Sequence, residues 1–180
     1  MQNNTLTVLF LGDVIGKPGR KAVAQYLQNS RADFIVINGE NLAGGIGITG
    51  RTAAEMLAMG VDVITTGNHV WKKKEVATYL MEEQRVIRPL NYPRGTPGFG
   101  YTVIRKNGMA LCVANIEGRI FMNPLDCPFR AMEGFLEEQD REIPVIVDFH
   151  AEATSEKIAM GWFLDGRVAA LMGTHTHVHT

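Results

Sequence analysis

The sequence predicts an α/β fold in which a largely parallel sheet is covered by helices on its faces. Three observations predict it. Short apolar runs alternate with amphipathic helical patterns along the 180 residues. The apolar runs are continuous, which is typical of parallel strands buried on both faces. Polar residues follow most of the runs, and functional groups of such sheets gather beyond the carboxyl ends of the strands.

The first half of the chain predicts three strand–helix units. Gly16, Pro18 and Gly19 predict a turn between the first strand and the first helix. The helices are expected to bury one apolar face, as Ala22 and Val23 do in the first of them. Strands are expected at residues 5–11, 34–37 and 61–65, and helices at residues 20–28, 52–59 and 73–83.

The second half begins with a turn-rich surface connection and then returns to regular elements. A hairpin is expected from residues 101–105 and 109–115, because Lys106-Asn107-Gly108 separates two apolar runs. Ser155 is expected to cap a helix, and Gly173 is expected to break the last apolar run. Helices are expected at residues 129–139 and 155–164, and strands at residues 144–149 and 168–172. No repeat or boundary divides the chain, so residues 1–180 predict a single domain.

Composition excludes several classes of protein. Lys+Arg 18 against Asp+Glu 19 gives no charge asymmetry that would favour a nucleic-acid partner or an anionic membrane. No apolar run approaches the roughly 20 residues of a membrane span, and the first residues lack the layout of a secretory signal. Cys112 and Cys127 have no CxxC spacing, so neither a disulfide framework nor a thiolate zinc site is indicated. These features predict a cytoplasmic protein with reduced thiols.

Residues able to bind a metal follow five of the apolar runs. Each of them alone has an ordinary explanation as a turn residue, a helix cap or part of a polar chain terminus. Together they indicate a metal site, because turn residues need not be oxygen and imidazole donors at five strand ends. In extended backbone, His175 and His177 would leave the chain on the same side. The candidates are Asp13, Glu40 with Asn41, Asn68 with His69, His150, and His175 with His177.

The donor set also indicates the kind of metal. Carboxylate, amide and imidazole groups without thiolate favour iron or manganese, with zinc as an alternative. These candidate ligands are too many for one tetrahedral ion. A carboxylate that bridges two divalent transition-metal ions accommodates them, and two-metal sites are a common solution for phosphoester hydrolysis.

The motifs resemble those of a known family. In chain order they are Gly12-Asp13, Gly39-Glu40-Asn41, Gly67-Asn68-His69, His150 and Gly173-Thr-His-Thr-His177. This order resembles the calcineurin-like metallophosphoesterases. The YmdB-type branch is more similar still, in Gly-Asp-Val-Ile-Gly, Asn-Gly-Glu-Asn and Thr-Gly-Asn-His-Val-Trp. Most metallophosphoesterases have Asp-x-His in the first motif and an aspartate in the second, where this chain, like that branch, has Ile15 and Glu40.

The resemblance implies a layered calcineurin-like sheet with helices on its faces, and a role for each site residue. Asp13, Glu40, Asn41 and His177 would hold one ion. Glu40 would bridge to a second ion held by Asn68, His150 and His175. His69 would be the catalytic acid that protonates the leaving group.

The implied activity is a binuclear metal-dependent phosphodiesterase. Its substrates would be small phosphodiesters: 2',3'-cyclic or 3',5'-cyclic nucleotides, or related esters. A homo-oligomer is left open. Members of the family continue well beyond the His-x-His loop, whereas this chain stops three residues after it, so a C-terminal part of the family domain is expected to be missing.

Two other functions are not excluded by the sequence. One is a nucleotide-binding module, because a loose match to the dinucleotide-binding fingerprint comes from Gly12, Gly16 and Gly19, with Glu40 after the second strand. The spacing of the glycines is not that of the G-x-G-x-x-G motif. A nucleotide-binding module of this kind leaves the histidines unexplained. A regulatory protein with a metal site and little turnover is the other alternative. Asp148 is open between orienting a ligand and capping a helix.

Overall fold

The computed structural model describes residues 5–180, in which seven strands form two sheets. The first sheet has the order β1-β2-β3 and is parallel. The second has the order β4-β5-β6-β7; β4 and β5 form an antiparallel hairpin and the other pairs are parallel. The strands are β1 Val8–Leu11, β2 Phe34–Asn38, β3 Val63–Thr65, β4 Tyr101–Lys106, β5 Met109–Glu117, β6 Val145–His150 and β7 Ala170–Thr174.

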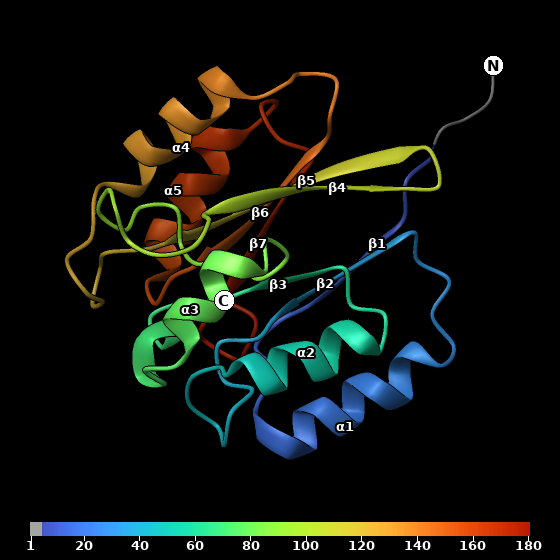
Figure 1. Ribbon diagram of the computed structural model, residues 1–180. Helices are drawn as coiled ribbons and strands as arrows, with labels where there is room; N and C mark the ends of the chain where they lie inside the picture. The colour runs from blue at the N-terminus through green and yellow to red at the C-terminus, as the bar shows by residue number, and fades with distance from the viewer. Residues whose placement is uncertain (1–4) are drawn as a thin grey trace.

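The helices cover the outer faces of the two sheets. In Figure 1, α1 and α2 lie beyond the first sheet and α4 and α5 beyond the second, so the layers follow in the order helix, sheet, sheet, helix. The helices are α1 Gly16–Leu27, α2 Gly50–Ala58, the short 3-10 helix η1 Val70–Lys72, α3 Val76–Glu82, α4 Pro128–Glu138 and α5 Thr154–Leu164. No helix within residues 5–180 is long and apolar enough to cross a membrane.

The α/β class is confirmed, but the expectation of one sheet is wrong. Alternate residues of each central strand enter different cores. In β2, Phe34 and Val36 pack between the two sheets, whereas Ile37 packs toward the helices. In β6, Ile146 packs between the sheets and Val147 packs toward the helices. A strand between a sheet and a layer of helices is apolar on both faces, and so is a strand between two layers of helices. The sequence pattern is therefore the same for the two arrangements.

Several predicted boundaries are also wrong. Helix α1 begins at Gly16, because Pro18 fits the first turn, where no backbone donor is needed. The helix expected at residues 73–83 is shorter, since α3 spans only Val76–Glu82, and the 3-10 helix η1 ends before residue 73. Ser155 is not a cap, since α5 starts at Thr154 and its N-cap is Ala153 without a side-chain hydrogen bond.

The last strand does not break at Gly173. β7 continues through Gly173 to Thr174 and pairs with β6 as far as His150. A Cβ at residue 173 would lie 3.1 Å from Cδ of Lys157, so glycine allows the α5 side chain to lie against the strand. Thr174 is therefore held in the sheet, beside the end of β6.

Candidate metal centre

His150 lies at the centre of a buried polar cluster. It is the last residue of β6 and its side chain is fully buried. Its Nε2 is 3.0 Å from Oδ1 of Asn68, 3.2 Å from Nδ1 of His175 and 3.2 Å from Oε2 of Glu40. Residues that follow β2, β3 and β7 thus meet at the carboxyl end of β6.

Gly67 makes this approach sterically feasible. A Cβ at residue 67 would overlap the His150 ring, so any other residue would displace the imidazole or the loop. The same loop carries Asn68 and His69, which come directly after Gly67. The Gly-Asn-His motif therefore combines the space for one imidazole with two polar side chains beside it.

Glu40 connects the cluster to the loop after β3. Its side chain is 1% exposed; Oε2 accepts the backbone N–H of His69 at 3.1 Å, and Oε1 accepts Nδ2 of Asn41 at 3.0 Å. Burial opposes ionisation, but the hydrogen bond and charge of His150, with the contacts to His69, outweigh it and lower the pKa of Glu40 to about 2. Glu40 is therefore a carboxylate at any physiological pH.

Asp13 forms the second part of the centre, after β1. Its Oδ2 accepts the backbone N–H of His175 at 2.8 Å, and its Oδ1 lies 3.6 Å from Nε2 of His177. Asp13 Oδ1 is buried and has no hydrogen-bond partner within residues 5–180. A buried carboxylate oxygen without a donor requires a partner, and a cation supplies one.

The His-x-His loop reaches the centre in a conformation that the sequence did not predict. His175 and His177 have φ values of +86° and +52°, in the left-handed region, so the expectation of extended backbone is wrong. The chain turns back after β7 ends at Thr174. As a result His175 faces His150, whereas His177, whose side chain is 43% exposed, faces Asp13.

Asn68 and His69 have different partners, although they are adjacent in the sequence. Oδ1 of Asn68 faces His150. Nδ1 of His69 lies 2.9 Å from Oδ1 of Asn41 and 3.2 Å from Oε1 of Glu40. The His69 side chain is 26% exposed. Since Nδ1 faces the two buried acceptors, Nε2 is the ring nitrogen left for a bound ligand.

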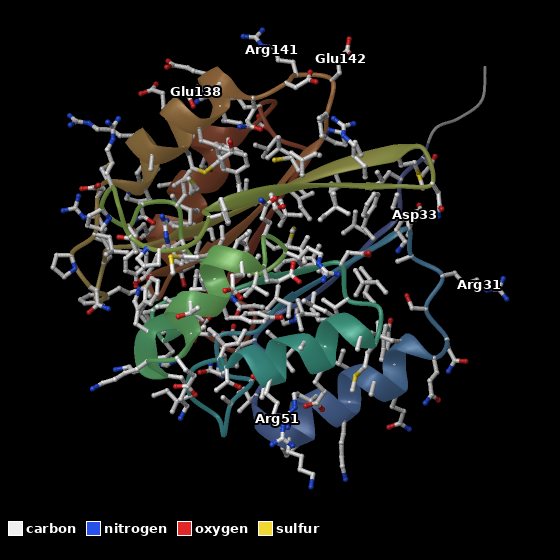
Figure 2. All side chains as sticks on the ribbon, in the orientation of Figure 1. Arg31, Asp33, Arg51, Glu138, Arg141 and Glu142 are labelled. Carbon is white, nitrogen blue, oxygen red and sulfur yellow. The ribbon has the colours of Figure 1, made fainter. Side chains whose placement is uncertain are left out.

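The residues fit a metal ion. Ligand atoms of Glu40, His150 and His175 all lie within 4.8 Å of one another. Around His150 Nε2 the neighbours are carboxylate and amide oxygens and a second imidazole nitrogen, which are typical donors for divalent transition metals. By contrast, charged side chains such as Arg31, Arg51 and Arg141 point outward, away from the sheets (Figure 2).

The candidate ligands fall into two neighbouring groups. Glu40 touches both His150 and Asn41, and the His175 backbone bonds to Asp13, so the groups are contiguous. Asn68, His150 and His175 form one group, and Asp13 with His177 forms the other. Asn41 lies beside Glu40 and His69. His179 is exposed and lies outside both.

The sequence left Asp148 unassigned and gave no indication of several other residues around the centre. Asp148, left open in the sequence, is fully buried beneath it and does not cap a helix. Burial raises the pKa of Asp148 to about 6, although the charge of His150 and hydrogen bonds from Thr174, Thr65 and Asn38 act against that rise. A polar residue inside an otherwise apolar strand, as at Asn38 and Asp148, is the signal that could have found these residues.

Glu117 and Glu152 were also missed. Glu117 ends β5, two residues beyond the predicted end of that strand at residue 115, and it is fully buried. Neither carboxylate oxygen of Glu117 has a hydrogen-bond partner within the described residues, and burial raises its pKa to about 7. Glu152 lies after β6, and its Oε2 is 2.9 Å from Nε2 of His175.

Comparison with known proteins identifies the family. The YmdB-like protein family matches residues 9–180. The 2',3'-cyclic-nucleotide 2'-phosphodiesterase of Bacillus subtilis (strain 168) is 46% identical over an alignment of 180 residues. The alignment covers 97% of this chain and 68% of that protein. The chain belongs to the YmdB-like protein family.

Solved structures of similar proteins support the same assignment. A protein from Thermus thermophilus is 48% identical, with a TM-score of 0.91 over 97% of this chain and 69% of that one. A phosphatase from Mycoplasma pneumoniae is 34% identical, with a TM-score of 0.88 over 98% of this chain and 66% of that one. This YmdB-like chain thus spans about two thirds of the length of these relatives. Their shared fold confirms the layered α/β architecture.

Proposed function

We propose that this YmdB-like protein is a metal-dependent phosphodiesterase that hydrolyses cyclic nucleotides, with 2',3'-cyclic nucleotides as its first substrate class. The observation that carries the proposal is the convergence of the strand-end donors on a buried centre in which Asp13 Oδ1 lacks a partner among residues 5–180. The substrate class follows the activity named for the B. subtilis relative. A nucleotide-binding module is less well supported, because both Glu40 oxygens face the histidine cluster.

Two divalent transition-metal ions, iron or manganese first and zinc as the alternative, are the cofactor of this proposal. Asp13, Glu40, Asn41 and His177 would hold one ion. Glu40, Asn68, His150 and His175 would hold the other. Such ions activate a water molecule as nucleophile and neutralise charge on the phosphoryl oxygens. The depressed pKa of Glu40 supports its bridging role, because it keeps the negative charge between the two groups.

His69 would protonate the departing ribose oxygen. Its Nδ1 is held by Asn41 and Glu40, and its partly exposed position leaves Nε2 for the substrate. Asn41 and Glu40 would therefore orient His69 as well as bind metal.

The direct test is hydrolysis of 2',3'-cyclic AMP by purified protein reconstituted with Mn²⁺. We expect a single nucleoside monophosphate product and no turnover after chelation. The matched control is the Asp13→Asn variant, which keeps the size of the side chain but removes the charge opposite His177. Absence of turnover by metal-loaded wild-type protein, for both 2',3'-cyclic and 3',5'-cyclic substrates, would reject the proposal and favour a regulatory metal site.

A further inference from the structure

A buried hydrogen-bond chain leads from His150 away from the metal centre. Nδ1 of His150 lies 2.9 Å from Oγ1 of Thr174, and Oγ1 of Thr174 lies 2.6 Å from Oδ1 of Asp148. His150 and Asp148 are 0% exposed and Thr174 is 4% exposed. These three hydrogen-bonded side chains are therefore isolated from solvent, so each of their hydrogen bonds must be made between protein groups.

The direction of each hydrogen bond follows from counting donors. Thr174 has one hydroxyl hydrogen, and its shorter contact is with the Asp148 carboxylate, which is an acceptor. Once that hydrogen is committed, Oγ1 of Thr174 can only accept from His150. Nδ1 of His150 must then carry the imidazole hydrogen.

The alternative donor to His150 is already used. Nδ2 of Asn38 is 3.4 Å from Nδ1 of His150, but it lies 2.9 Å from Oδ2 of Asp148 and 3.3 Å from the carbonyl oxygen of Thr66. An amide nitrogen has two hydrogens, and these two nearer acceptors take both. Asn38 therefore holds Asp148 in place and leaves Nδ1 of His150 as a donor.

We propose that Asp148 and Thr174 are positioning residues that fix the His150 tautomer, with hydrogen on Nδ1 and the Nε2 lone pair directed at the metal centre. Asp148 is not itself a ligand, since both its oxygens accept hydrogen bonds from Asn38, Thr65 and Thr174. The hydroxyl of Thr174 lies between Asp148 and His150. A hydroxyl placed between carboxylate and imidazole does here what a carboxylate does directly in many metal sites: it sets the tautomer and the ring orientation.

The arrangement explains why a threonine precedes the His-x-His loop. β7 and β6 pair in register at Thr174 and His150, so the hydroxyl is delivered beside the ring by the sheet itself. Asp148 lies two residues before His150 on the same strand and on the same face. The three groups are thus positioned by rigid strands, whereas the ligands Asn68, His175 and His177 lie on loops.

This proposal depends on the proposed function in one respect only, which is that a metal ion is the partner of His150 Nε2. Its first test is the tautomer of His150 in the wild-type chain, from long-range ¹H–¹⁵N correlation spectra of protein with ¹⁵N-labelled histidine. Spectra are recorded for Zn²⁺-loaded protein and for metal-free protein at pH 9. We expect hydrogen on Nδ1 in both states. A His150 Nδ1 without hydrogen in the metal-free protein would overturn the proposal, even for a chain that binds no metal and so fails the proposed function.

The second test compares variants by Mn²⁺ titration of metal-free protein. Thr174→Val removes the hydroxyl and should weaken one of two binding events by about 10–100-fold, the usual effect of losing a partner of a ligating histidine. Thr174→Ser keeps the hydroxyl and should restore the affinity. Thr65→Val is the matched control, because it removes another hydrogen bond to Asp148 without contacting His150. Wild-type affinity in folded Thr174→Val, or equal losses in Thr174→Val and Thr65→Val, would contradict the positioning role of Thr174.

Discussion

Nδ1 of His175 lies 3.2 Å from Nε2 of His150, and ligand atoms of both rings are within 4.8 Å of the Glu40 carboxylate. Two imidazole nitrogens at this separation share either a hydrogen or a cation, because two lone pairs would repel each other. A cation between the rings and the carboxylate satisfies all three groups. This pair, delivered by β6 and by the loop after β7, is the centre on which the proposed function depends.

Glu40→Gln should reduce binding of both ions. The substitution keeps the size of the side chain but removes the charge that faces both His150 and His69. Asn41→Ala is the comparison, because it removes an amide on one side only and should weaken mainly one ion. The measurement is Mn²⁺ stoichiometry and affinity by calorimetry. Loss of a single ion in Glu40→Gln would show that Glu40 does not bridge.

His69→Ala should retain metal but lose about 10²–10⁴ in turnover of a 2',3'-cyclic nucleotide, the usual range for general acid catalysis. The loss should be much smaller with bis(p-nitrophenyl) phosphate, because nitrophenolate scarcely needs a proton to leave. Asn68→Ala is the control, since its Oδ1 faces His150, and it should lose metal and slow both substrates. Equal losses on the two substrates in metal-loaded His69→Ala would exclude the acid role.

Glu152→Ala should weaken metal binding only slightly. Oε2 of Glu152 is 2.9 Å from Nε2 of His175, so it favours the tautomer that leaves Nδ1 free. However, the Glu152 side chain is 46% exposed, and exposed ion pairs contribute at most about 1 kcal/mol, or roughly fivefold in affinity. The effect should shrink in high salt. Glu142→Ala, an exposed carboxylate at the molecular surface (Figure 2), should leave the titration unchanged. A loss in Glu152→Ala as large as in Thr174→Val would contradict this ranking.

Glu117→Gln should alter the pH dependence of stability in metal-free protein. Burial raises the pKa of Glu117 above its value in the unfolded chain, to about 7. Its contribution to stability is therefore fully present below about pH 4.5 and is lost as the pH rises through 7. The free energy of unfolding should fall by up to about 3 kcal/mol over this interval, at roughly 1.36 kcal/mol per pKa unit.

The measurement for Glu117 is urea unfolding across the range from acidic to mildly alkaline pH. Glu117→Gln should flatten the profile and be more stable than wild type at the alkaline end. Glu133→Gln changes an exposed carboxylate and should reproduce the wild-type slope. A wild-type profile that rises with pH through neutrality, unchanged by Glu117→Gln, would show that Glu117 does not titrate as its burial requires.

Strand-end motifs carried most of what the sequence could predict. Asp13, Glu40, His150 and the His-x-His loop lie where parallel strands end, and the order of strands and helices is local information in the chain. The assignment of two sheets was not predictable in this way, because Phe34 and Ile37 are equally apolar whichever layer covers them. Conformation within loops was equally hidden, because His175 and His177 both have left-handed backbone where the sequence predicts extended strand.

Residues that act through other residues were the hardest to find. Thr174 is an ordinary strand residue in sequence, and its importance appears only when β6 and β7 bring it to His150 and Asp148. Glu117 gave no signal either, because the strand that buries it continues further than its apolar pattern. Long-range register, and not residue type, decides these positions.

The central claim is that this centre holds two metal ions. Elemental analysis of protein purified without oxygen, or stripped and reconstituted with Mn²⁺ or Fe²⁺, tests it most directly. We predict close to two ions per chain in wild type and a marked loss in Asp13→Asn and His150→Ala, with the secondary structure retained by circular dichroism. A stoichiometry near zero in reconstituted, folded wild-type protein would contradict the metal centre, and a value that saturates at one would contradict the bridging role of Glu40.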